Sequence, residues 1–251
     1  MDKGNTKEYL EVILGTIKHA FGDRPSDPEV TDALWNTVHN LDGPRSKQNV
    51  KISDKEKFIY QKLFKGLDEI TSSYYRMKDI TYYFSHFPYV GEKDVSHPNY
   101  LRYHIENYLN EMYILKLRIT DYIKVITRSY KKSSNYGDMQ SALDGIKKAI
   151  VDCMDGLITT RGSHVHQSRF TNDDIDRLTT LDLLGLNDGH VGKECDVLKQ
   201  DGCKDLEATW VNIMDINKGV LDDMLDKLFQ ILLEHITHDG EIFFPDHTVW
   251  T

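Results

Sequence analysis

The strongest constraint on the fold is a long stripe of apolar residues that begins just after His97-Pro98. Apolar side chains recur there every three or four positions: Leu101, Ile105, Tyr108, Met112, Leu115, Ile119, Tyr122 and Ile126. A half-buried strand would show alternation with a period of two, so this spacing predicts one long amphipathic helix. A helix of this length has to bury its apolar face against other helices, which favours a helical bundle.

Other stretches of the chain show the same helical period. Helices are predicted over residues 6–21, 30–41, 53 to about 87, 139–160, 171–184 and 206–238. Ser53 followed by Glu56 forms a capping box at one of these starts, and Gly162 is expected to be a helix C-cap or a hinge. Residues 187–202 are polar and glycine-rich, so a loop is predicted there. The tail from residue 239 is expected to fold back onto the bundle, and little room is left for sheet.

These patterns divide the chain into two parts. Residues 1–95 are predicted to form an N-terminal helical extension, and residues 96–251 are predicted to form the bundle itself. A chain of 251 residues is long enough for one large domain with such an extension. The predicted fold class is therefore all-α.

Composition excludes several classes of protein. No run of about 18 apolar residues occurs, so no membrane span is expected. The three cysteines, Cys153, Cys195 and Cys203, have no recognised metal-binding spacing. Their odd number, together with a start that lacks the apolar core of a signal peptide, predicts reduced thiols and a cytoplasmic location.

The formal net charge of −9 restricts what the surface can bind. Proteins that hold long nucleic acids without sequence preference display basic surfaces, because released counterions supply the affinity. This chain cannot do so over its whole surface. Any role with RNA would have to depend on a local basic cleft, a small substrate or a basic partner.

The segment whose side chains are best suited to catalysis lies at residues 159–167, where Arg161 is followed by Ser163, His164 and His166. Four residues separate Arg161 from His166. An arginine followed after four to six residues by a histidine resembles the signature of the HEPN superfamily (higher eukaryotes and prokaryotes nucleotide-binding). Residues 99–113 also resemble the first long helix of one bacterial branch, and the similarity covers roughly residues 95–240.

The resemblance implies a HEPN-type helical bundle and a metal-independent endoribonuclease that acts on RNA in defence or stress, as toxins do, without a cofactor. It also implies a homodimer in which the motifs of two protomers face each other across one cleft. A regulatory or antitoxin protein is a further expected partner. One position departs from the family pattern: Gly162 stands where many catalytic members have asparagine or another polar residue.

The chemistry of the pair follows from RNA itself, which carries its nucleophile, the 2′-hydroxyl, beside the scissile phosphate. A histidine with a pKa near neutrality can move the proton, and an arginine can bind the phosphate oxygens with two hydrogen bonds. The expected catalytic residues are therefore Arg161 and His166, and the expected product is a 2′,3′-cyclic phosphate. Ser163 is expected to cap the helix or donate a hydrogen bond to the phosphate.

Helical geometry does not place the two residues together. On a straight helix, a residue five positions further along is rotated about 140° around the axis from the first. Arg161 and His166 therefore share a face only if Gly162 bends the chain, whereas His164 lies closer to the face of Arg161 and is an auxiliary candidate. Glu111 and Asp121, on the preceding long helix, are candidates for orienting these side chains.

Alternative interpretations remain open for each of these residues. Arg161 could be a cation stabilised by the helix C-terminus, and His166 could be a partly buried residue held by one hydrogen bond. The His164/His166 pair has a spacing that suits a strand, and no Cys or carboxylate cluster completes a metal site. The acidic balance and Gly162 favour a non-catalytic nucleotide- or protein-binding module, while the intact Arg and His favour a ribonuclease.

Tyrosines are a second feature with two interpretations. They occur in pairs and stripes: Tyr74, Tyr75, Tyr82, Tyr83, Tyr108, Tyr113 and Tyr122. Exposed aromatic rings can stack on nucleic-acid bases, but tyrosines at helical spacing more often pack in the core and at its rim. Packing is the interpretation that the spacing favours.

Overall fold

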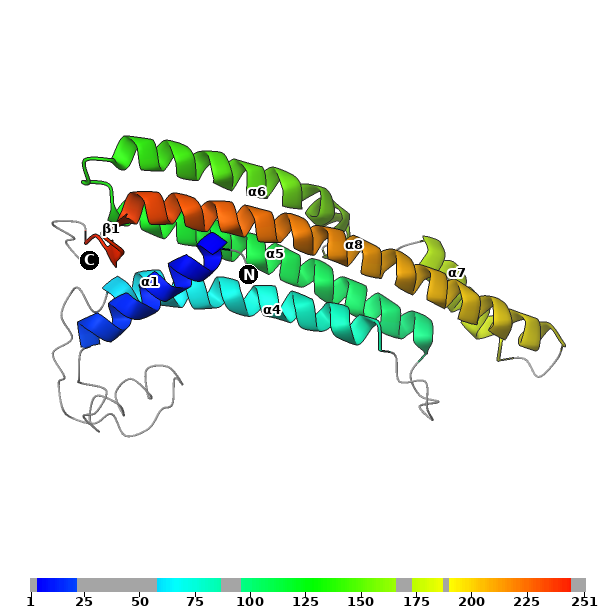
Figure 1. The fold of residues 1–251 in the computed structure, drawn as a ribbon. Helices are drawn as coiled ribbons and strands as arrows, with labels where there is room; N and C mark the ends of the chain where they lie inside the picture. Colours follow the sequence, from blue (N-terminus) through cyan, green and yellow to red (C-terminus); the bar gives the residue numbers. More distant parts are fainter. Residues whose placement is uncertain (1–3, 22–57, 87–95, 166–172, 187–189, 245–251) are drawn as a thin grey trace, which may run out of the picture. The chain divides into compact units, whose positions relative to one another are not determined.

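The computed structural model describes residues 4–21, 58–86, 96–165, 173–186 and 190–244, with side chains for all of these except 19–21 and 156–165. The fold is an all-α helical bundle, as predicted. Its elements, drawn in Figure 1, are α1 (Gly4–Phe21), the short π-helix η2 (Ile59–Phe64), α4 (Lys65–Phe84), α5 (His97–Ser129), α6 (Tyr136–Val165), α7 (Asp173–Leu184), α8 (His190–Ile236), β1 (Thr237–His238) and β2 (Glu241–Ile242). Within these ranges, no helix has both the length and the apolar character that crossing a bilayer requires.

The chain forms two compact units, and each combines segments that are far apart in sequence. The first unit takes residues 1–68, 121–144 and 225–251, and the second takes residues 69–120 and 145–224. The helices α5, α6 and α8 each contribute one part to each unit.

Aromatic residues form the core of the first unit. Tyr9 of α1 stacks on Phe229 of α8, with 4.9 Å between the ring centroids. The hydroxyl of Tyr9 also shares a hydrogen bond of 2.6 Å with the hydroxyl of Tyr122 of α5. Gly66 of α4 lets the Tyr122 ring approach closely, since a Cβ at Gly66 would lie 2.4 Å from Cδ2 of that ring. Burial raises the pKa of both tyrosines, which therefore stay neutral.

A second group of contacts in this unit surrounds the turn at residues 130–135 that joins α5 to α6. The buried ring of Tyr130 meets the edge of Phe58, with centroids 6.0 Å apart. The Tyr130 hydroxyl donates to the backbone carbonyl of Phe243 at 2.7 Å. Asn135 donates from Nδ2 to the carbonyl of His235 at 2.9 Å. The polar groups of these two side chains therefore have partners at the end of α8 and in the tail.

A two-stranded hairpin follows α8, where the sequence predicted almost no strand. β1 and β2 pair antiparallel across Asp239 and Gly240, which have φ values of 53° and 79°. An Asp-Gly pair is a preferred two-residue hairpin turn because both positions tolerate positive φ. The backbone N–H of Phe243 bonds to the carbonyl of Ile236, so the described part of the tail folds back as predicted.

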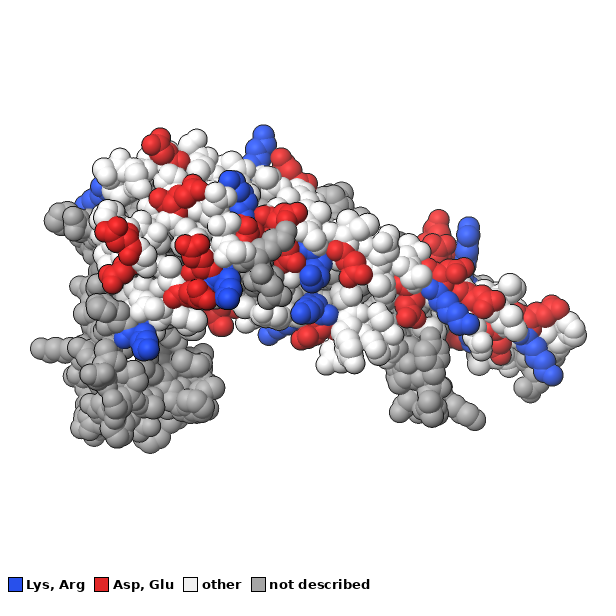
Figure 2. Space-filling model, in the orientation of Figure 1, with Lys and Arg blue, Asp and Glu red and all other residues white. Residues whose placement is uncertain are grey.

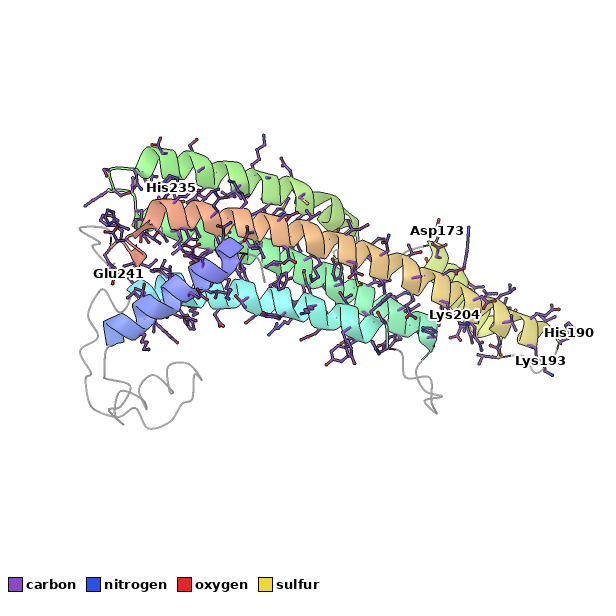
Figure 3. The ribbon with its side chains drawn as sticks, viewed as in Figure 1. Asp173, His190, Lys193, Lys204, His235 and Glu241 are labelled. Carbon is purple, nitrogen blue, oxygen red and sulfur yellow. The ribbon has the colours of Figure 1, made fainter. Side chains whose placement is uncertain are left out.

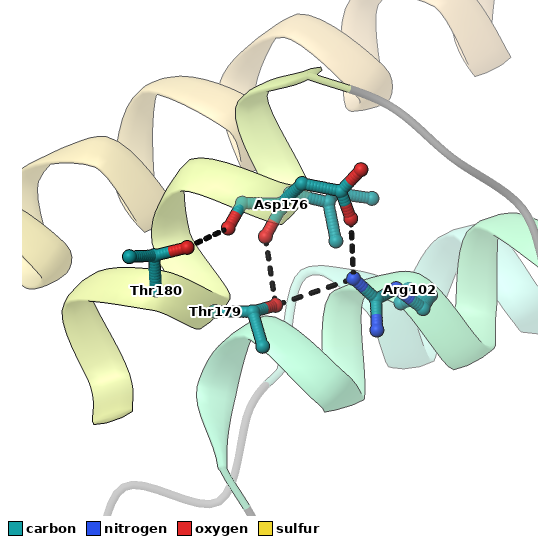
Figure 4. A network of polar contacts seen from close by, with 5 residues as sticks. Arg102, Asp176, Thr179 and Thr180 are labelled. Carbon is teal, nitrogen blue, oxygen red and sulfur yellow. Dashed lines mark hydrogen bonds and ion pairs between the residues drawn. The ribbon is translucent and has the colours of Figure 1, made fainter. Parts of the chain in front are cut away.

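In the second unit, α7 is held to α5 by a polar network (Figure 4). The guanidinium of Arg102 donates to Asp176 at 2.9 Å and to Thr179 at 3.2 Å. Arg102 is mostly buried at this point. Because a guanidinium has several donors in a fixed plane, one arginine can hold two side chains of the same helix.

The predicted loop at residues 187–202 is wrong, because α8 begins at His190. Tertiary contacts explain the difference. Lys199 donates to Asp182 of α7 at 2.9 Å, and Gly202 lies against Leu178, whose Cδ2 would be 2.6 Å from an added Cβ. Glycine is unfavourable in an isolated helix, but here it permits close packing of α7 on α8.

Several helix boundaries match those predicted from the sequence, and others differ from them. The predicted starts of α1, α5 and α7 are confirmed to within a few residues. α6 continues to Val165, so Gly162 lies inside a helix and is not its C-cap. The predicted helix at residues 30–41 and the capping box at Ser53 lie outside the described residues.

Candidate functional site

The candidate motif lies at the end of α6. Arg161, Ser163 and His164 belong to its last turns, and His166 follows its last residue and lies outside the described residues. The side chains of residues 156–165 are also outside the description. The pairing of Arg161 with His166 therefore stays a prediction.

The backbone of α6 nevertheless constrains how the motif can work. The helix is continuous through Gly162, so Arg161 and His164 belong to one uninterrupted helix. Residues three apart on one helix are neighbours on its surface, which applies to Arg161 and His164. The role of His164 as an auxiliary residue stays a prediction.

Glu111 of α5 is engaged by α4 in the second unit. Its Oε2 accepts a hydrogen bond from Ser73 at 3.3 Å, and its Oε1 lies 3.6 Å from Nη1 of Arg76. Ser73 also accepts a hydrogen bond of 2.6 Å from Arg118. The mostly buried carboxylate of Glu111 thus helps to hold α4 and α5 together.

Asp121, the other carboxylate predicted to orient the motif, is exposed. Its Oδ1 lies 2.9 Å from the ammonium of Lys124, one turn further along α5. The contact between α5 and α6 that precedes the motif is instead an ion pair between Lys116 and Asp155. Asp155 comes six residues before Arg161, so α5 supplies a mostly buried cation about two turns before the motif.

The described surface is electrostatically mixed. On the face drawn in Figure 2, acidic and basic side chains are interspersed, and no continuous basic area is visible among the described residues. The same residues include no group of three His, Cys, Asp or Glu arranged to hold a metal ion. On this face, a phosphate would therefore have to be bound by a few local cations.

The tyrosines divide into a buried and an exposed set. Tyr74, Tyr108 and Tyr122 are almost fully buried, which confirms the packing interpretation for them. Tyr82 and Tyr83, at the end of α4, are more than half exposed. These two rings lie at the rim and remain accessible for stacking.

A further exposed tyrosine at the start of α5 has no clear signal in the sequence. Tyr103 is more than half exposed and contacts the ring of His104 at a centroid distance of 5.2 Å. Tyr82 similarly stacks on His86 at 4.2 Å. The hydroxyl of Tyr100 donates to the carbonyl of Tyr83, which joins the end of α4 to the start of α5. An aromatic surface therefore lies at this end of the second unit.

A cluster of titratable groups beside this surface was also missed from the sequence. Nε2 of His97 lies 3.9 Å from Oε2 of Glu207, and both side chains are mostly buried. Burial, and then the nearby Lys199, lower the pKa of His97, whereas burial raises the pKa of Glu207. Burial also raises the pKa of Cys203 to about 11, too high for a thiolate nucleophile near neutral pH. The cluster is a packing junction between α5 and α8.

A hollow of about 400 Å³ lies in the first unit between α1 and the hairpin. Among the described residues that line it, the charged ones are all acidic: Glu8, Glu11 and Glu241. Carboxylates repel phosphate, so this hollow does not suit a nucleotide or RNA.

No protein-family model, curated protein or solved structure matches this chain. Its function therefore has to be inferred from its own residues. The two features best suited to binding or catalysis are the end of α6 and the exposed tyrosines.

Proposed function

We propose that this chain is a metal-independent endoribonuclease of HEPN type that acts in defence or stress. The observation that supports it best is the position of Arg161 and His164 in the last turns of α6, the long helix that follows α5. The resemblance to the HEPN motif calls for such a placement, at the end of the second long bundle helix. A cytoplasmic location and control by a regulatory or antitoxin protein belong to the same proposal.

In this proposal the substrate supplies the nucleophile. The 2′-oxygen attacks phosphorus while His166 takes its proton, and the departing 5′-oxygen is protonated in turn. Arg161 binds the phosphate oxygens on which charge accumulates. The products are a 2′,3′-cyclic phosphate and a 5′-hydroxyl. Arg161 and His166 of two protomers would complete the cleft in a homodimer.

The roles of the neighbouring residues follow from their positions on α6. His164 is an auxiliary residue beside Arg161, and Ser163 donates a hydrogen bond to the phosphate. Glu111 and Asp121 also have partners on α4 and on α5 respectively.

The decisive experiment is cleavage of cellular RNA by the purified protein in EDTA, with the ends mapped. His166→Ala should lower the rate about 10²–10⁴-fold, and Arg161→Ala about 10²–10³-fold. His164→Ala should have a smaller effect. His190→Ala and Arg177→Ala are matched controls, because both side chains are highly exposed on other helices. Circular dichroism should show that every variant keeps its helices.

The alternative is a non-catalytic HEPN module that binds nucleotide or protein, and the mixed surface charge and Gly162 favour it. This alternative predicts that the wild type cuts no RNA, with or without a partner. Binding would then be detected with 2′-O-methyl RNA, which lacks a free 2′-hydroxyl and cannot be cleaved by this route. Wild-type protein that cuts no RNA, with or without a partner, would contradict the ribonuclease proposal whether or not it binds RNA.

A further inference from the structure

The second unit carries a group of aromatic rings where the end of α4 meets the start of α5. We call it the aromatic surface, and its six residues are Tyr82, Tyr83, His86, Tyr100, Tyr103 and His104. The hydroxyl of Tyr100 donates to the carbonyl of Tyr83, so the two helix ends lie side by side (Figure 3). Tyr82 is 62% exposed, Tyr83 is 56% exposed and Tyr103 is 61% exposed. Both helices therefore present rings to solvent at this end.

Contacts within the aromatic surface hold its rings in place. Tyr82 stacks on His86 with 4.2 Å between the ring centroids and 23° between the planes. Nδ1 of His86 lies 2.6 Å from the carbonyl of Tyr82, which holds the imidazole in that stack. On α5, Tyr103 meets the ring of His104 edge to face at 5.2 Å. Rings that are ordered in this way lose little conformational entropy when a ligand covers them.

The exposed apolar residues of this region are of one kind. Within residues 69–86 and 96–116, every large apolar side chain that is exposed is a tyrosine: Tyr75, Tyr82, Tyr83 and Tyr103. Exposed aliphatic residues such as Leu183 and Val191 lie on α7 and α8 instead. Flat rings without aliphatic neighbours match another flat ring, such as a nucleobase, better than the branched side chains of a protein.

One cation on α4 is placed to accompany a bound base. Lys78 is exposed and comes four residues before Tyr82, so the two side chains share a face of the helix. A lysine ammonium there can hold one phosphate next to the stacked base. Asp79 is also exposed and comes four residues before Tyr83, so the rings are not surrounded by a broad basic area. Stacking therefore has to supply most of the affinity.

We propose that the aromatic surface binds unpaired bases of single-stranded RNA, which stack on Tyr82 and Tyr103 while Lys78 contacts a phosphate. The identity of the strand as RNA rests on the proposed function, but the site uses none of the residues of the motif at the end of α6. Bases within a duplex are already stacked on their neighbours, so paired RNA is excluded from this site. A free nucleotide offers one base to several rings, so it binds more weakly than a strand.

The test is the binding of a fluorescent 2′-O-methyl oligouridine of about ten nucleotides, read by anisotropy. Tyr82→Ala and Tyr103→Ala should each weaken binding about 5–100-fold, the range for the loss of one stacking ring. Tyr82→Phe keeps the ring and should bind like wild type, whereas Tyr82→Leu keeps apolar bulk without a flat face and should bind as weakly as Tyr82→Ala. Phe243→Ala, at an exposed ring of the other unit, is the matched control and should have no effect.

The salt dependence of binding tests the role of Lys78. Each phosphate contact to a single strand contributes about −0.7 to the slope of log K against log salt concentration. Lys78→Ala should therefore make the slope less negative by about 0.7. Lys193→Ala, at an exposed lysine of α8 that Figure 3 labels, should leave the slope unchanged. An unchanged slope in Lys78→Ala would remove Lys78 from the site.

Several results would overturn the proposal. Wild type that does not bind the strand, or tyrosine-to-alanine variants that bind it as tightly as wild type, would exclude the aromatic surface as the site. Tyr82→Leu that binds like wild type would show that stacking is not used. A duplex or uridine monophosphate that binds as tightly as the strand would contradict the assigned occupant. This oligonucleotide has no free 2′-hydroxyl and is not cut, so binding and cleavage of cellular RNA succeed or fail separately.

Discussion

Each of the two compact units is stabilised internally by a different kind of contact. In the first, the buried ring of Tyr9 stacks on Phe229, and the hydroxyls of Tyr9 and Tyr122 share a hydrogen bond. In the second, partly exposed ion pairs such as Lys199–Asp182 hold α7 and α8 together. Aromatic burial depends little on pH and salt, whereas ion pairs depend on both. The units should therefore respond differently to mutation and to acid.

The largest loss of folding stability is expected from a substitution in the first unit. Phe229→Ala removes a fully buried ring that stacks on Tyr9, so it should lower the free energy of unfolding by about 3–5 kcal/mol. Urea unfolding followed by circular dichroism measures this change. Tyr82→Ala is the matched control, because that ring is mostly exposed and should contribute less than about 1 kcal/mol to folding. A loss below about 1 kcal/mol for Phe229→Ala would show that this core is not the main support of the unit.

A smaller effect is expected for the ion pairs of the second unit. Lys199→Met leaves the carboxylates of Asp182 and Asp196 without their shared cation, and should destabilise the protein by about 1–3 kcal/mol. Lys7→Met, which removes an exposed pair with Glu11, should cost less than about 1 kcal/mol. Equal effects of the two variants would mean that the Lys199 pairs act as ordinary surface pairs.

Mild acid should affect the second unit first. Burial lowers the pKa of His97 and of His104 below their ordinary value, so the unfolded chain binds protons at a higher pH than the folded chain does. Stability should therefore fall as the pH drops from about 7 through about 6.5, the ordinary histidine pKa. In the first unit, hydrogen bonds from Asn5 and Thr6 lower the pKa of Asp226 despite partial burial, so its contribution is lost only below about pH 4.

This difference can be measured from urea midpoints at about pH 7.5 and about pH 5.5, a window that lies above the titration of ordinary carboxylates. The midpoint of wild type should be lower at the acid end. His104→Leu should flatten that dependence, because it removes one of the two histidines that have to stay neutral. A wild-type midpoint that does not change across this window would contradict the prediction.

The smallest effect is expected at the start of α1. Asp226 of α8 accepts hydrogen bonds from the backbone N–H of Thr6 at 3.1 Å and from Nδ2 of Asn5 at 2.8 Å. Asp226→Asn keeps the shape but removes the charge beside a helix N-terminus, so a loss of about 1 kcal/mol is expected. Asp144→Asn, at an exposed position of α6, is the control for the change in net charge. Thermal unfolding that moves equally in both variants would show no specific role for Asp226.

Some features of the candidate site could be predicted from the sequence, and others could not. The position of Arg161 and His164 near a helix end follows from the apolar period of α6. The partner of Glu111 does not, because Ser73 and Arg76 are more than thirty residues away and only packing brings α4 alongside α5. The exposed ring of Tyr103 was equally hidden, since helical spacing alone does not show where the neighbouring helices end.

The sequence by itself determined the local elements of this protein. The all-α class and the start of α5 at His97 follow from apolar spacing and from Pro98, which are properties of neighbouring residues. Only the tertiary structure decided that α8 begins at His190. The glycines there predict a loop in isolation, but contacts with α7, such as Gly202 against Leu178, stabilise the helix. Such contacts join residues distant in sequence, so their free energy cannot be read from local propensity.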